Sequence, residues 1–151
     1  MRISARTDYA VRVLVSLAAD ASRPLTCESI AAQQQIPYRF LKSVVRDLRV
    51  AGLVRSQRGC EGGYWLGREA REITLADVVA AVDGELFTVK GEVPDAAGYP
   101  EPADRLEVLW RGLRARLASV FSGITIADLL ADEPGGPAAA LFAEATTALP
   151  A

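Results

Sequence analysis

Residues 36–66 read IPYRFLKSVVRDLRVAGLVRSQRGCEGGYWL, and this stretch decides the fold prediction. Pro37 suits the first turn of a helix, where its missing N–H leaves no bond unmade. The helical spacing of apolar residues predicts a helix from about Pro37 to Ala51. Its inward side chains are expected to be Phe40, Leu41, Val44, Val45 and Leu48. Its outward side chains are expected to be Arg39, Lys42, Ser43, Arg46 and Arg49.

A hairpin is predicted directly after this helix. Gly52 is typical of a helix stop, and residues 53–56 are apolar and short enough for a strand. The glycine-rich run 58–63 then leads into Tyr64-Trp65-Leu66. Two short strands joined by such a turn form a hairpin with a wide tip.

Two helices are predicted before residue 36. Apolar residues recur at steps of three and four from Thr7 to Ala19, and Thr26 is a suitable N-cap for a short second helix. Three helices followed by a hairpin are the parts of a winged helix-turn-helix. The predicted fold is therefore mainly α, with a small β-hairpin wing.

After the hairpin, Thr74 and Thr125 are each followed three residues later by aspartate, so both are expected to cap short helices, through Val82 and Leu130. Residues 84–102 are broken by Gly and Pro and predict a loop. A long helix is expected from about Ala103 to Phe121. Its apolar stripe, too large for a solitary helix, contains Leu106, Leu109, Trp110, Leu113 and Leu117. This helix needs a partner surface.

The expected organisation has four parts: a winged helix-turn-helix domain at 1–83, a loop at 84–102, a long dimerisation helix with a short following helix at 103–133, and a tail at 134–151. The tail is Ala-rich and predicts at most a frayed helix. No apolar run is long enough to span a bilayer and no signal core opens the chain, so a cytoplasmic protein without membrane contact is expected.

Charge is distributed unevenly along the chain. Residues 1–72 hold 12 Lys and Arg against 7 Asp and Glu, a net of +5, whereas residues 73–151 hold 5 against 12, a net of −7. Such an asymmetry can place a basic face on an acidic protein whose net charge is −2. The alternative is that these charged residues lie on ordinary solvent-exposed faces, which would give the same net charges for the two halves.

Catalytic chemistry finds little support in the composition. The chain has no histidine, which removes the commonest general base and most zinc sites. The glycines at 59–63 lie in a hairpin and lack the spacing and following helix of a phosphate loop. Cys27 and Cys60 have no third ligand, so no metal site is predicted. A thiol enzyme that uses either cysteine is the weakest alternative, because a base is missing.

The helix at 37–51 and the wing together predict a DNA-binding surface. In a helix-turn-helix, the N-terminal side chains of the second helix meet base edges in the major groove. Here the exposed positions are Tyr38, Arg39, Lys42 and Ser43. Arg58 at a glycine-rich hairpin tip suits a narrow minor groove, which attracts guanidinium groups. A solvated basic face is the bland alternative.

Several segments resemble the Rrf2 family of winged helix-turn-helix regulators, which includes IscR- and NsrR-like proteins. The resemblance spans about residues 1–132, in order and at matching spacings. It rests on the opening MRIS with Tyr9-Ala-Val11, on IPYRFL at 36–41, on LRVAGLV at 48–54, on RGCEGGYWL at 58–66, on ITLADVVAAVDG at 73–84, on Leu109-Trp110 and on ITIADL at 124–129.

The resemblance implies a homodimer joined by the long helix, which reads a pseudo-palindromic operator in double-stranded DNA. The family's DNA contacts fall by position on Ser4, Tyr9, Pro37, Arg39, Lys42, Ser43, Arg58 and Gly59. Relatives often carry a polar or acidic residue in this helix, where Arg39 and Lys42 stand here, so the operator cannot be inferred from theirs.

The largest departure from the family concerns its cofactor. Sensing members hold an iron-sulfur cluster with cysteines in the loop before the long helix, and residues 85–102 contain none. Asp8 matches a carboxylate ligand of some relatives, and Glu107 stands where some have histidine, but carboxylates without thiolates cannot hold such a cluster. The cluster is predicted to be absent.

The sequence thus predicts a DNA-binding transcriptional regulator and not an enzyme, and repressor is the favoured role. Its effector stays open: a small molecule between head and long helix, a protein partner, or oxidation of Cys60 at the wing tip. A winged-helix module that binds protein in place of DNA is the alternative from another class. The basic residues Arg39, Lys42 and Arg58 favour DNA.

Overall fold

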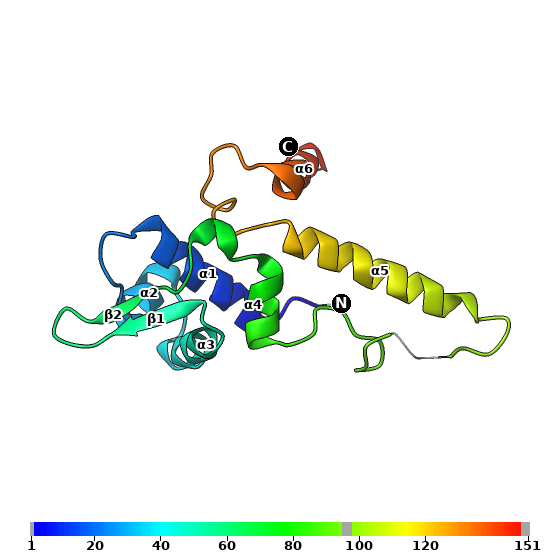
Figure 1. Ribbon diagram of the computed structural model, residues 1–151, viewed down its shortest axis with the longest axis horizontal. Helices are drawn as coiled ribbons and strands as arrows, with labels where there is room; N and C mark the ends of the chain where they lie inside the picture. The colour runs from blue at the N-terminus through cyan, green and yellow to red at the C-terminus, as the bar shows by residue number, and fades with distance from the viewer. Residues whose placement is uncertain (1, 95–97, 149–151) are drawn as a thin grey trace.

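The computed structural model describes residues 2–94 and 98–148. A helical head carries a two-stranded antiparallel sheet beside α2 and α3, and the elements follow the order of the predicted winged helix-turn-helix (Figure 1). The elements are α1 (Ala5–Ala19), α2 (Cys27–Gln34), α3 (Tyr38–Val50), β1 (Val54–Gln57), β2 (Gly63–Leu66), the 3-10 helix η1 (Ala70–Glu72), α4 (Leu75–Val82), α5 (Arg105–Ser122) and α6 (Gly136–Ala148).

The helix starts confirm two predicted caps. The Thr26 hydroxyl accepts a hydrogen bond from the Ser29 N–H at 3.1 Å and opens α2. Thr74 opens α4 with a full capping box, in which its hydroxyl and the Asp77 carboxylate each accept from the other's backbone N–H, at 3.1 and 3.0 Å. These bonds satisfy N–H groups that a helix start leaves without partners.

The core lies where α1, α2, α3 and α4 meet. Its fully buried side chains include Leu14, Ile30, Leu41, Leu48 and Ile73. The prediction that Phe40 faces inward is wrong, because 59% of its surface is exposed. At 100° per residue, Phe40 lies a quarter turn from the centre of the buried stripe of α3.

The wing is anchored to the loop between α1 and α2. Val54 pairs with Leu66 and Gln57 with Gly63 in the hairpin. Leu25 adds a bridge to Tyr64, with N–H···O distances of 3.0 and 2.8 Å in the two directions. A Cβ at Gly63 would lie 2.8 Å from the Leu25 carbonyl oxygen, so this approach requires glycine. The hairpin therefore has a fixed position beside α2 and α3.

The helix α5 projects away from the head and confirms the predicted long helix (Figure 1). None of its residues is buried. The segment 84–102 has neither helix nor strand in its described part, as expected, and α5 begins at Arg105, shortly after the predicted start near Ala103. Within the described residues, none of the helices has the length and hydropathy that crossing a bilayer needs.

The chain after α5 departs from prediction in two places. Residues 126–130 form a turn and not a helix, although the capping bonds between Thr125 and Asp128 are present at 2.8 and 3.3 Å. Pro134 disfavours helical conformation at the preceding residue, so a helix that begins after Thr125 would have to end before it. The tail, in turn, forms the regular helix α6 over Gly136–Ala148, because its Ala-rich sequence has high helix propensity.

Candidate nucleic-acid interface

The predicted recognition helix presents its polar N-terminal face to solvent. Tyr38, Arg39 and Lys42 are exposed, and Pro37 stands at the N-cap position. The Tyr38 hydroxyl donates to Glu28 Oε1 at 2.8 Å, and Lys42 Nζ lies 5.6 Å from the centre of the Tyr38 ring. Tyr38 and Lys42 are four residues apart, which places them on one helix face.

A groove of about 490 Å³ separates this face from the wing. We call it the recognition groove. It is lined by the start of α2, by α3 and by the hairpin. Three cations line it, namely Lys42 and Arg49 from α3 and Arg58 from the wing, against one carboxylate, that of Glu28. Its charge therefore suits an anionic partner.

The basic side chains of this surface hold no ion pair within the described part of the chain. Among the described residues, Arg39, Lys42, Arg49 and Arg58 form no ion pair, whereas eight other contacts between basic and acidic groups are present. A guanidinium or ammonium that already holds a carboxylate must give it up to bind phosphate. These four need no such exchange.

The wing tip has backbone that favours glycine. Gly59 has φ +113°, in the region that side chains disfavour. A Cβ at Gly62 would lie 2.6 Å from the Gln57 carbonyl oxygen, so the turn closes only with glycine there. Arg58, Gly59 and Cys60 are consequently all exposed at the tip.

Three predicted DNA contacts carry intramolecular bonds in the structure. Ser4 caps α1, where its hydroxyl accepts from the Thr7 N–H at 3.0 Å and donates to Asp83 Oδ2 at 2.5 Å. Tyr9 is half-buried under the Arg12 guanidinium, 5.8 Å from its ring. Ser43 accepts from Arg6 Nη1 at 3.2 Å. Ser4 and Tyr9 lie at the start of α1, and Ser43 lies on α3 where it faces α1; none of the three lines the groove.

The predicted site did not include several residues that line the groove, among them Arg49, Glu28 and Tyr64. Arg49 follows Lys42 by seven residues, a spacing that puts both on one helix face, so the signal was present. Glu28 and Tyr64 come from other elements, and only the tertiary structure brings them to the groove. Arg6 was missed for the same reason, and its ion pair with Asp47 ties α1 to α3.

The two cysteines lie in different environments. Cys27 is buried under the wing and is hydrogen-bonded to Tyr64, and burial raises the pKa of its thiol. Burial also raises the pKa of the Tyr64 hydroxyl. Both groups stay protonated at neutral pH, so Cys27 has a packing role. Cys60 is exposed at the wing tip.

This arrangement of head, wing and long helix agrees with comparisons to known proteins. Residues 3–132 match the family model Rrf2, described as an iron-dependent transcriptional regulator. The chain belongs to the Rrf2 family. As a member it is a DNA-binding transcriptional regulator, and its relatives are regulators and not enzymes.

Relatives and solved structures of this family match most of the chain. The Mycobacterium tuberculosis protein Rv1287 is 43% identical over 134 residues, which cover 85% of this chain and 81% of that protein. The structure of CymR, the global cysteine regulator of Bacillus subtilis, superposes with a TM-score of 0.72 at 32% identity and covers 85% of this chain and 95% of CymR. For T. potens IscR the TM-score is 0.69 at 29% identity, with 86% of each chain covered.

The residues present do not fit the iron chemistry in the family's description. Cys27 is buried in α2, Cys60 lies at the wing tip, and residues 84–102 carry no cysteine. In the part of the chain that the structure describes, no three side chains of His, Cys, Asp or Glu come together as a metal site would require. An iron-sulfur cluster needs thiolate ligands that converge, and this donor set does not supply them.

Proposed function

We propose that the protein is a homodimeric repressor that recognises a specific DNA operator without an iron-sulfur cluster. The observation that carries this proposal is the set of four unneutralised cations, Arg39, Lys42, Arg49 and Arg58, on α3 and the wing. Arg39 and Lys42 are placed to reach guanine edges in the major groove, and Arg58 to enter the minor groove. Pro37, Tyr38, Ser43 and Gly59 complete the contact surface, with Ser4 and Tyr9 beside it.

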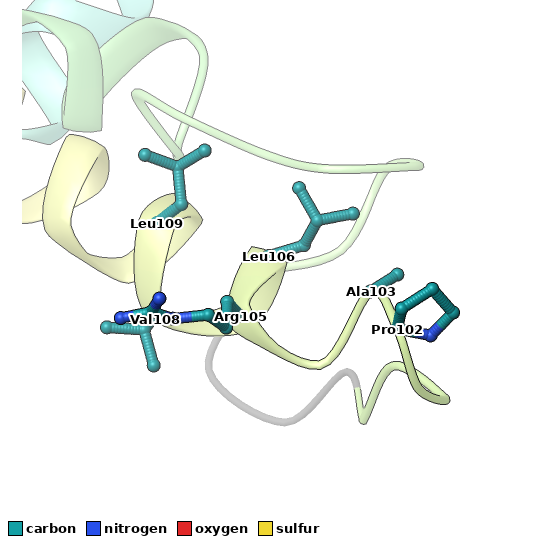
Figure 2. A pocket seen from close by; sticks show the side chains of 6 residues that line it. All are labelled: Pro102, Ala103, Arg105, Leu106, Val108 and Leu109. Carbon is teal, nitrogen blue, oxygen red and sulfur yellow. The ribbon is translucent and has the colours of Figure 1, made fainter.

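The helix α5 supports a dimer. Leu109 and Leu113 are 51% and 41% exposed, because α5 buries none of its residues against its own chain. Figure 2 shows Leu106 and Leu109 on one side of the first turns of α5. Both line a hollow of about 540 Å³. Leu117 continues the stripe. Trp110 of the same stripe also packs on Phe87 of its own chain, with 6.4 Å between the ring centroids. A second α5 would cover this stripe.

Regulation is proposed to act where the head meets α5. A cavity of about 380 Å³ lies there between α4, residues 84–86 and α5. Small side chains, including Ala76, Ala115 and Ala118, leave this space open. A small-molecule effector bound here would change how the head is held on the dimer helix. A protein partner is the other candidate effector.

A second candidate function is thiol-based sensing through Cys60. Its thiol is exposed two residues after Arg58, in the segment proposed to approach DNA. Oxidation there would add bulk and charge beside phosphate and weaken DNA binding without touching the core. One solved relative is described as the oxidized form of Staphylococcus aureus CymR.

The proposal is tested by recovering genomic duplexes that the protein binds and then measuring affinity at several salt concentrations. Binding is expected to weaken steeply as salt rises, because phosphate contacts release counterions. Arg58→Ala should cost about 1–3 kcal/mol in operator binding. The matched control is Arg71→Ala, since Arg71 lies on η1 and is paired with Glu69 at 2.7 Å.

Two results would contradict the proposal. Equal operator affinity for Arg58→Ala and wild type would remove the wing from the interface. Failure to select any duplex would favour the protein-binding module. A reporter placed behind a recovered operator tests repression, because a bound dimer should lower its expression.

A further inference from the structure

The carboxylate of Glu28 stands in an unfavourable place for a DNA-binding surface. It is the sole acidic side chain among the residues that line the recognition groove, which otherwise holds Lys42, Arg49 and Arg58. Hydrogen bonds from its own backbone N–H and from Tyr38 lower the pKa of Glu28, so it is charged at neutral pH. A charge of this sign repels every phosphate that enters the groove.

The contacts of Glu28 connect it to the reading face of α3. Its Oε1 accepts from the Tyr38 hydroxyl at 2.8 Å, and the Tyr38 ring lies under Lys42 Nζ at 5.6 Å. Glu28 is the second residue of α2, whose start is fixed by the Thr26 cap. The Tyr38 side chain, 42% exposed, is thereby held at its outer end by a different helix from its own.

We propose that Glu28 is a positioning residue for sequence recognition: it aims Tyr38, and through the Tyr38 ring Lys42, at the bases. The proposal rests on the proposed function, since it concerns how the same surface reads DNA. DNA that seats in the groove excludes water, and an O–H···O⁻ bond strengthens when water is excluded. The carboxylate thus lowers affinity for all DNA and raises the preference for the right sequence.

The effect of Glu28 on affinity for all DNA and its effect on sequence preference can be measured separately, because its charge and its hydrogen bond can be removed independently. The quantity to measure is the ratio of affinities for a duplex selected by the wild type and for a scrambled duplex of the same length. Glu28→Gln keeps an acceptor for Tyr38 but removes the charge. Both affinities should rise, and the ratio should stay within about twofold of wild type.

Glu28→Ala removes the acceptor as well, and Tyr38→Phe removes the donor. Each should lower the ratio by about three- to tenfold, the range that one net hydrogen bond supports. The double variant should lose no more than the single ones, because both break the same bond. Glu72→Gln is the matched control for loss of charge, since Glu72 is exposed on η1, outside the groove, and should change neither affinity nor ratio.

An unchanged ratio in Glu28→Ala would overturn the proposal, and so would losses that multiply in the double variant. A ratio that falls in Glu28→Gln as far as in Glu28→Ala would also overturn it, because it would mean that the carboxylate itself contacts a base. If the wild type prefers no duplex at all, the proposed function fails first. If the wild type discriminates and the variants match it, only the role of Glu28 fails.

Discussion

The dimer helix offers the sharpest quantitative test. Full burial of a leucine side chain is worth about 1.5–3 kcal/mol. Leu109 and Leu113 have 51% and 41% of their surface still exposed, so a partner that covers both contributes about 1.4–2.7 kcal/mol per protomer. Both protomers contribute, which gives about 3–5 kcal/mol per dimer. The double variant Leu109→Glu, Leu113→Glu should therefore raise the dimer Kd by at least about a hundredfold.

Sedimentation equilibrium over a range of protein concentrations measures this change directly. Glutamate has good helix propensity, so α5 itself should persist. Val50→Glu is the control, because Val50 is 82% exposed at the end of α3 and lies off the proposed seam. A double variant that sediments as the wild-type dimer would place the interface elsewhere. A wild type that is monomeric at micromolar concentration would refute the dimer itself.

Three further predictions concern the cofactor, the wing thiol and the segment after α5. Protein purified without oxygen should be colourless, and stoichiometric iron and sulfide would contradict the absence of a cluster. Mild peroxide should weaken operator binding of the wild type but not of Cys60→Ser; equal losses in both, or none, would remove Cys60 from sensing. Hydrogen bonds from Thr125 lower the pKa of Asp128, so its stabilisation exists above the unfolded pKa and is lost as pH falls through the folded one. Asp128→Ala should thus lower the free energy of unfolding by about 1 kcal/mol at pH 7 and by less below about pH 3, as measured by denaturant titration.

Local signals predicted the elements of the head well, because each is encoded by neighbours in sequence. Thr26 and Thr74 cap their helices through bonds that span three residues, and the glycine-rich turn between two short apolar segments marks the hairpin. The prediction failed where position within a helix face mattered. Phe40 is apolar and adjacent to the buried stripe of α3, yet its quarter-turn offset leaves it exposed.

The site was predictable only in part, because some of its residues come together from different helices. The cations of α3 and the wing could be found from spacing along the chain. Glu28 could not be assigned to them, because it belongs to another helix and only the packing of α2 on α3 brings its carboxylate to Tyr38. Ser4 combines both cases: its capping bond to Thr7 is local, whereas its hydrogen bond to Asp83 joins residues far apart in the sequence.

Asp83 joins α4 to α1 within the head, next to the cavity where we propose that an effector acts. Its Oδ2 accepts from Ser4 at 2.5 Å and from Thr7 at 2.7 Å, so the end of α4 is tied to the start of α1. The next residue, Gly84, has φ +82° and lines the cavity between the head and α5. A ligand that moves residues 84–86 must therefore either break these hydrogen bonds or move the start of α1 with them. Arg6 lies between Ser4 and Thr7 and is paired with Asp47 of α3, so such a displacement has a short covalent and hydrogen-bonded route to the recognition helix.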